Sequence, residues 1–160
     1  MIVKPFDQRH YKQISSIYKE GLQTGIATLE TEVPDWESWD LNHHTFCRIA
    51  VFDGQQILGW GALSPVSKRE VYSGVAEVSV YVSRKCFSQG IGSVLMKTLI
   101  EESEKNGIWT LQSSVFESND RSLRLHQKFG FRKVGYRERI GQRNGVWINT
   151  IILERRSSKI

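Results

Sequence analysis

Apolar and polar residues alternate over residues 75–82, and this period of two predicts a β-strand with two unlike faces. One face carries valines at positions 78, 80 and 82, and the other carries Glu77, Ser79 and Tyr81. Over residues 89–106 the apolar positions instead recur three and four residues apart, which predicts an amphipathic helix. The chain therefore passes from a half-polar strand into a helix.

The same patterns predict the other elements of the chain. Helices are expected over residues 8–22, around Trp36 to Leu41, and over 120–129, and strands over 2–5, 47–53, 56–64, 109–116, 132–140 and 146–153. Residues 23–35 are predicted to form a loop and residues 155–160 a mobile tail. Strands joined early by hairpins and later by helices predict an α/β fold with a mixed sheet covered by helices.

The composition limits the kind of protein. A length of 160 residues suits one domain, residues 1–160, with an ordinary core. The apolar runs are too short to cross a membrane. Cys47 and Cys86 lack metal-site spacing, so we expect reduced thiols in a cytoplasmic protein and no metal. The net charge of +5 suits an anionic ligand, but no basic cluster is dense enough to indicate nucleic acid.

A short basic turn with the sequence Gly90-Ile-Gly92 joins the predicted strand to the predicted helix. Such a unit aims unpaired backbone N–H groups and the positive helix end at one point, which makes a site for phosphate. A dinucleotide fingerprint would need glycine at Leu95, and the Gly-Lys-Ser/Thr of a P-loop does not occur. By itself, the Gly-x-Gly motif is also compatible with a plain β–α turn that binds no ligand.

The segment Phe87-Ser-Gln-Gly-Ile-Gly92 resembles the pyrophosphate loop of the GNAT superfamily of N-acetyltransferases, although Phe87 stands where the family has Gln or Arg. Residues 118–131 resemble its second cofactor segment, an Asn-initiated helix that ends in Gly-Phe. Further matches at residues 17–21, 27–31, 74–82 and 141–149 resemble the phosphinothricin and methionine sulfoximine acetyltransferase branch. The resemblance implies a twisted, mostly antiparallel sheet of about six or seven strands with about four helices. It also implies splayed central strands and a homodimer.

The cofactor that the resemblance implies is acetyl-CoA, whose pantetheine arm would enter the gap between the splayed strands. The residues expected to bind it are Val80, Tyr81 and Val82 by their backbone, Arg84, Lys85, Gln89, Gly90, Ile91, Gly92 and Ser93 in the turn, and Asn119 and Ser122 in the later helix. Arg84 and Lys85 would add charge, unless they only form a solvated turn. Phe87 removes a side-chain donor but no backbone amide, so the cofactor affinity is expected to fall while the site survives.

Two residues are expected to carry the chemistry. Glu77 is a carboxylate in mid-strand, which is costly unless it is paired or functional, and it falls where the branch has its proposed catalytic Glu. The alternative is a salt-bridged carboxylate of the sheet. His126 falls where many family members have a Tyr that protonates the leaving thiolate, and imidazole can do the same. A structural histidine is the alternative there.

The acceptor is expected to contact Thr28, Glu30, Lys68, Arg69, Tyr72 and Trp147. Lys68 and Arg69 could bind a carboxylate or phosphinate, or could simply form an exposed basic loop. Ile148 stands where phosphinothricin acetyltransferases carry a His, so any role of that His cannot transfer to this chain.

The leading hypothesis is an acetyl-CoA-dependent N-acetyltransferase that acts on a small amino-acid-like amine by direct attack in a ternary complex. An acetyltransferase for a protein N-terminus or another amine is a second hypothesis. Phe87 motivates a third, a catalytically silent acyl-CoA-binding domain. A nucleic-acid-binding module rests only on a pI near 9.3 and would show steeply salt-dependent binding.

Overall fold

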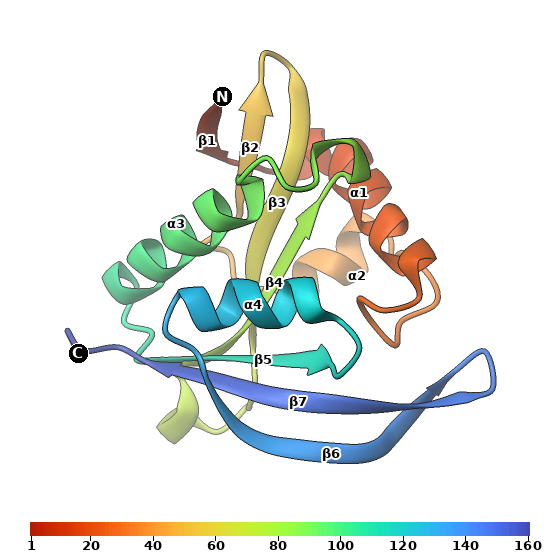
Figure 1. Cartoon of the computed structure of the whole chain (residues 1–160). Coiled ribbons are helices and arrows are strands. Elements are labelled where there is room, and N and C mark those ends of the chain that lie inside the picture. The colour runs from red at the N-terminus through yellow and green to blue at the C-terminus, as the bar shows by residue number, and fades with distance from the viewer.

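Seven strands form one sheet in the order β1-β2-β3-β4-β5-β7-β6 in the computed structural model, which describes residues 1–160 (Figure 1). Their bounds are β1 Ile2–Pro5, β2 Ile49–Asp53, β3 Gln56–Pro65, β4 Val75–Val82, β5 Thr110–Phe116, β6 Arg132–Arg143 and β7 Val146–Arg156. Every neighbouring pair is antiparallel except β4 and β5, which are parallel. The prediction of a mixed, mostly antiparallel sheet is confirmed.

Four α-helices cover the sheet (Figure 1). They are α1 Tyr11–Thr24, α2 Trp36–Leu41, α3 Ile91–Lys105 and α4 Asp120–Lys128, and short 3₁₀ helices occupy Gln8–His10, Glu70–Tyr72 and Arg84–Cys86. The helix expected from residue 89 begins only at Ile91, because Gly90 has the left-handed φ of 82° that an α-helix excludes. Asn119 caps α4 as predicted, since its side chain accepts a hydrogen bond from the Ser122 N–H.

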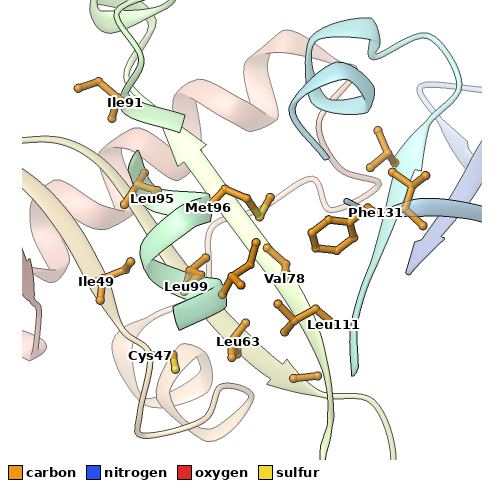
Figure 2. Close-up of a cluster of buried hydrophobic side chains, with 14 of the residues drawn as sticks. Cys47, Ile49, Leu63, Val78, Ile91, Leu95, Met96, Leu99, Leu111 and Phe131 are labelled. Atoms are coloured by element: carbon orange, nitrogen blue, oxygen red, sulfur yellow. The ribbon is translucent and has the colours of Figure 1, made fainter. Parts of the chain in front are cut away.

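Two hydrophobic clusters lie on opposite faces of the sheet because side chains alternate along each strand. Figure 2 shows the larger cluster, in which α3 places Leu95, Met96 and Leu99 against Val78 and Leu111 of the sheet. The second cluster joins α1 and α2 to the other face. The face of β4 that carries its valines therefore meets α3, and the face with Glu77, Ser79 and Tyr81 meets the α1 side.

β4 and β5 separate soon after they begin to pair. Their register runs only from Val75 opposite Thr110 to Glu77 opposite Gln112, although β4 continues to Val82 and β5 to Phe116. The edges that the two strands turn toward each other beyond Glu77 therefore have no strand partner. This splaying of the central strands was expected from the family resemblance, and α4 lies in front of it in the view of Figure 1.

The C-terminal boundary differs from the prediction. β7 pairs with β5 as far as Arg156, so the segment expected to be a mobile tail from Arg155 begins inside the sheet. Ser157 is buried, and its hydroxyl donates to Glu104, which also forms an ion pair with Lys159. The expected start of the tail is wrong, because a carboxylate of α3 binds the end of the chain. None of the helices is long and apolar enough to cross a membrane.

Candidate active site

A cleft of about 1070 Å³ opens between the separated strands and the helices around them. The separated halves of β4 and β5, the start of α3, helix α4 and the loop that follows α1 all contribute to its walls. Residues from both faces of β4 line it, including Val80 on the α3 side and Tyr81 on the α1 side. The cleft therefore passes through the gap in the sheet and connects its two faces.

The start of α3 forms one end of the cleft. Gly90 is its N-cap and offers no side-chain hydrogen bond, so the N–H groups of the first turn are left for a ligand. A Cβ atom at Gly92 would lie 3.3 Å from Leu125 of α4, which shows how closely the second helix approaches this turn. Unpaired amides and the positive end of a 15-residue helix together suit a phosphate group.

Not every residue predicted for this turn contributes in the expected way. The Gln89 N–H donates to the Cys86 carbonyl at 3.4 Å, and the Gln89 side chain donates to the Lys85 carbonyl, so both are used within the turn. Ile91 is buried in the core and offers only its amide. The expectation that Gln89 presents a free amide is therefore wrong. The amides that remain for an anion are those of Gly90–Ser93.

The positive charge of the cleft comes from α4 and not from the turn. Arg84 and Lys85 are exposed and do not line the cleft, and the Arg84 N–H donates to the Glu20 carboxylate at 2.7 Å. Arg121 and Arg124 do line it. Sequence reasoning missed these two arginines, although their spacing of three residues just after the Asn119 cap places them on one side of a helix.

Asn119 and Ser122, which were predicted to bind the cofactor, lie in the cleft wall. The side chain of Asn119 has a second contact, since its Nδ2 donates to the Ile26 carbonyl at 3.2 Å. It thereby ties the start of α4 to the loop after α1. The hydroxyl of Ser122 lies 3.4 Å from Nδ1 of His126 one turn later in the same helix.

His126 is a buried, neutral imidazole in the cleft wall. Its Nδ1 lies 2.7 Å from the Ser122 carbonyl, which can only accept, so Nδ1 carries the proton. Burial lowers the pKa of His126, while the bond to the Ser122 backbone opposes that shift in part. Nε2 is buried without a hydrogen-bond partner and is left as an acceptor.

Glu77 is half-buried in the cleft, at the point where β4 and β5 part. Its one hydrogen-bond partner is Gln112 of β5, whose Nε2 lies 3.4 Å from Oε2. It forms no ion pair, so the alternative of a salt-bridged sheet carboxylate is not what the structure shows. The carboxylate is thus held in place by a hydrogen bond but is not paired with a cation.

The loop after α1 forms the opposite end of the cleft. Thr28 and Glu30, which were predicted to contact the acceptor, line it, and so does Tyr18 of α1, which was not predicted. Arg143 of β6 fixes this loop, since its guanidinium donates to the carbonyls of Thr28 and Glu30. A neighbouring pocket of about 490 Å³ shares Tyr18, Glu30, Ser79 and Tyr81 with the cleft. Burial raises the pKa of both tyrosines, so they keep their protons.

Four residues predicted to contact the acceptor lie outside both cavities. Lys68, Arg69 and Tyr72 belong to the exposed segment before β4, and the Arg69 guanidinium lies over the Tyr72 ring at 5.3 Å. Trp147 is exposed near the start of β7. Their predicted roles rested on closeness in sequence to Glu77 or on the resemblance. The segment enters the N-terminal end of β4, whereas the cleft opens along its C-terminal half.

The chain is similar to known acetyltransferases over most of its length. A model of the Acetyltransferase (GNAT) family matches residues 11–131. The phosphinothricin N-acetyltransferase of Alcaligenes faecalis is 32% identical over 154 residues, covering 89% of this chain and 75% of that protein. Another, from Streptomyces coelicolor, is 27% identical and covers 96% of this chain and 94% of its own.

Solved structures share the fold. A phosphinothricin acetyltransferase of Sinorhizobium meliloti in complex with acetyl-CoA matches 97% of this chain and 87% of its own, with a TM-score of 0.88 and 23% identity. A ribosomal-protein-alanine N-acetyltransferase of Brucella melitensis matches 98% and 100%, with a TM-score of 0.91 and 23% identity. The chain belongs to the GNAT family of N-acetyltransferases, enzymes that take their acetyl group from acetyl-CoA.

Proposed function

We propose that this enzyme transfers the acetyl group of acetyl-CoA to the primary amine of a small amino-acid-like substrate. The observation that carries the proposal is the cleft through the sheet, which joins an anion site at Gly90–Ser93 to an unpaired carboxylate at Glu77. The names of the relatives, phosphinothricin and methionine sulfoximine acetyltransferases, support an acceptor of the amino-acid type.

The residues of the cleft fit acetyl-CoA. The free amides at the start of α3 would bind its pyrophosphate, and Gly92 leaves room beside Leu125 for the close approach. The unpaired edge of β4 from Val80 to Val82 would bond to the amides of the pantetheine arm, as an added strand does. When bound, acetyl-CoA supplies the acetyl group as a thioester that an amine attacks, releasing CoA.

Glu77 would accept the proton that the acceptor ammonium must lose before or during attack. Direct transfer in a ternary complex is supported by the position of the thiols. Cys47 and Cys86 are both buried, and neither lines the cleft, so the cleft offers no cysteine for an acyl-enzyme. The amine would therefore attack the thioester directly, with Glu77 as the base.

His126 suits a different task from the one predicted. Its proton is on Nδ1 and is bonded to Ser122, so Nε2 could donate to a thiolate only from the doubly protonated form. Burial opposes that charged form. We propose that Nε2 accepts a hydrogen bond in the loaded cleft, and that water protonates the thiolate, whose ordinary pKa is about 8–9.

Glu30 and the two tyrosines would receive the acceptor ammonium. Glu30 is the carboxylate at the loop end of the cleft, and the rings of Tyr18 and Tyr81 lie 4.8 Å apart beside it. A carboxylate with aromatic faces favours a cation. Since Lys68 and Arg69 lie outside the cleft, they drop out of the proposed acceptor site.

Release of CoA thiol over a panel of amines tests this function. We expect turnover with methionine sulfoximine, phosphinothricin or ordinary amino acids. Glu30→Gln should raise the acceptor KM about tenfold through the loss of a charged hydrogen bond, and the KM for acetyl-CoA should stay the same. Arg69→Ala is the control and should change neither. Turnover of peptide N-termini alone, or CoA binding without any turnover, would overturn the proposal.

We also propose that the protein is a homodimer, as its family resemblance implies. The hairpin of β6 and β7 supports an interface, since β6 is an edge strand and Tyr136, Ile140, Val146 and Trp147 are exposed on the hairpin. Light scattering after size exclusion should give twice the mass of the 18.4 kDa chain. Trp147→Lys should shift the protein toward monomer, while Leu41→Lys, at a still more exposed apolar residue on α2, should not. A monomeric wild type at micromolar concentration would contradict it.

A further inference from the structure

Phe87 is the residue at which this chain departs from the pyrophosphate loop that it otherwise resembles. In the structure its ring does not simply fill space. The guanidinium carbon of Arg121, from the first turn of α4, lies 3.9 Å from the centre of the Phe87 ring. That distance is well within the range of a cation–π contact. Phe87 thus links the turn before α3 to the start of α4.

Arg121 has no other partner in the protein. It forms no ion pair and donates no hydrogen bond to another residue, although Asp120 precedes it directly. Phe87 and Arg121 both line the cleft, together with Gly90, Gly92 and Ser93 of the anion site. A guanidinium whose face is stacked keeps the N–H groups of its edge available, and these match a phosphate in a two-point contact.

We propose that Arg121, positioned by Phe87, binds the pyrophosphate of CoA and takes the place of the side chain that the turn lacks. The inference rests on the proposed acetyl-CoA site and names the residues that complete it. The Gln or Arg of the family loop would reach the phosphates from the turn itself. Here the donor comes from α4, and the aromatic ring at position 87 orients it.

Calorimetric titration with CoA tests the proposal without any need for turnover. Arg121→Ala should weaken CoA binding about tenfold, the scale of a lost charged hydrogen bond. The residue is exposed, so the variant should keep its melting temperature. Lys85→Ala is the matched control, because Lys85 is an exposed cation in the turn before α3 and does not line the cleft. It should leave the affinity unchanged.

The role of Phe87 is tested by coupling. Phe87→Leu keeps an apolar side chain but removes the ring face, and should weaken CoA binding about threefold, a loss on the scale of a cation–π contact. In the double variant Arg121→Ala/Phe87→Leu, the second change should add nothing to the loss from Arg121→Ala. Two fully additive losses would overturn the assignment of Phe87 as a positioning residue.

Shortened ligands identify the phosphate. Arg121→Ala should weaken the binding of dephospho-CoA, which lacks only the 3′-phosphate, as much as it weakens the binding of CoA. It should not change the affinity for pantetheine, which has no phosphate. A loss confined to CoA would place Arg121 at the 3′-phosphate and overturn the pyrophosphate assignment. An unchanged affinity of Arg121→Ala for CoA would overturn the whole inference. Failure of the wild type to bind CoA would instead refute the proposed function.

Discussion

Glu77→Gln should lower kcat/KM by about 10²–10⁴ near pH 7, the usual contribution of a general base. The substitution keeps the shape of the side chain and its contact with Gln112, but it removes the group that accepts the proton. Glu77 is the only residue with a carboxylate among those of β4 and β5 that line the cleft. The structure strengthens this prediction because no cation neutralises that carboxylate.

The pH dependence separates a base from a structural residue. An α-amino group has an ordinary pKa of about 8, so solution supplies more neutral amine as the pH rises, and the defect of Glu77→Gln should shrink. The affinity for CoA should stay the same, and Glu70→Gln, at an exposed carboxylate outside the cleft, should behave like the wild type. Equal activity of Glu77→Gln and the wild type, with chemistry rate-limiting, would make Glu77 structural.

Gly92→Glu should weaken CoA binding about 100-fold or more. The new side chain would occupy the close approach beside Leu125 and bring a negative charge to the anion site, where like charges cost several kcal/mol. A glutamate in the first turn complements the positive end of α3, so the fold should not lose stability for electrostatic reasons. The melting temperature and a calorimetric titration with CoA measure the two effects separately.

The matched control for this variant is Gly92→Ala. Its methyl group would meet Leu125 at 3.3 Å, which a small movement of that side chain can relieve. We expect a modest loss of CoA affinity from the added bulk alone, far smaller than the loss from Gly92→Glu. If a folded Gly92→Glu protein binds CoA as tightly as the wild type, the start of α3 is not the cofactor site.

Short-range patterns were enough to predict most of the fold. The alternation of polar and apolar residues in β4 predicted both its bounds and the separation of its valines from Glu77, because each face of the strand meets a different cluster. The start of α3 was placed two residues early because the hydrophobic pattern does not register the left-handed φ of Gly90. The end of β7 was missed because Glu104, far away in sequence, binds the last residues.

The candidate site was predictable where a local signal or a family motif marked a residue, as at Glu77, Glu30 and the glycine turn. It was not predictable where the contact joins distant segments. Phe87 was expected only to lower the cofactor affinity, because its contact with Arg121 joins the turn to a helix that lies far away in sequence. Arg69 was predicted to contact the acceptor because it lies close to β4 in sequence. In the structure it lies at the N-terminal end of that strand, whereas the cleft opens along the C-terminal half.

The short pairing of β4 with β5 leaves the protein with two unpaired edges in the interior of its own sheet. Exposed strand edges invite other chains to pair with them and so promote aggregation. Here the edges face each other and lie in a cleft walled by α4 and by the loop after α1. A slender ligand with amide groups can enter. We expect the pantetheine arm of acetyl-CoA to pair with these edges, so that the cofactor would complete the sheet whenever it binds.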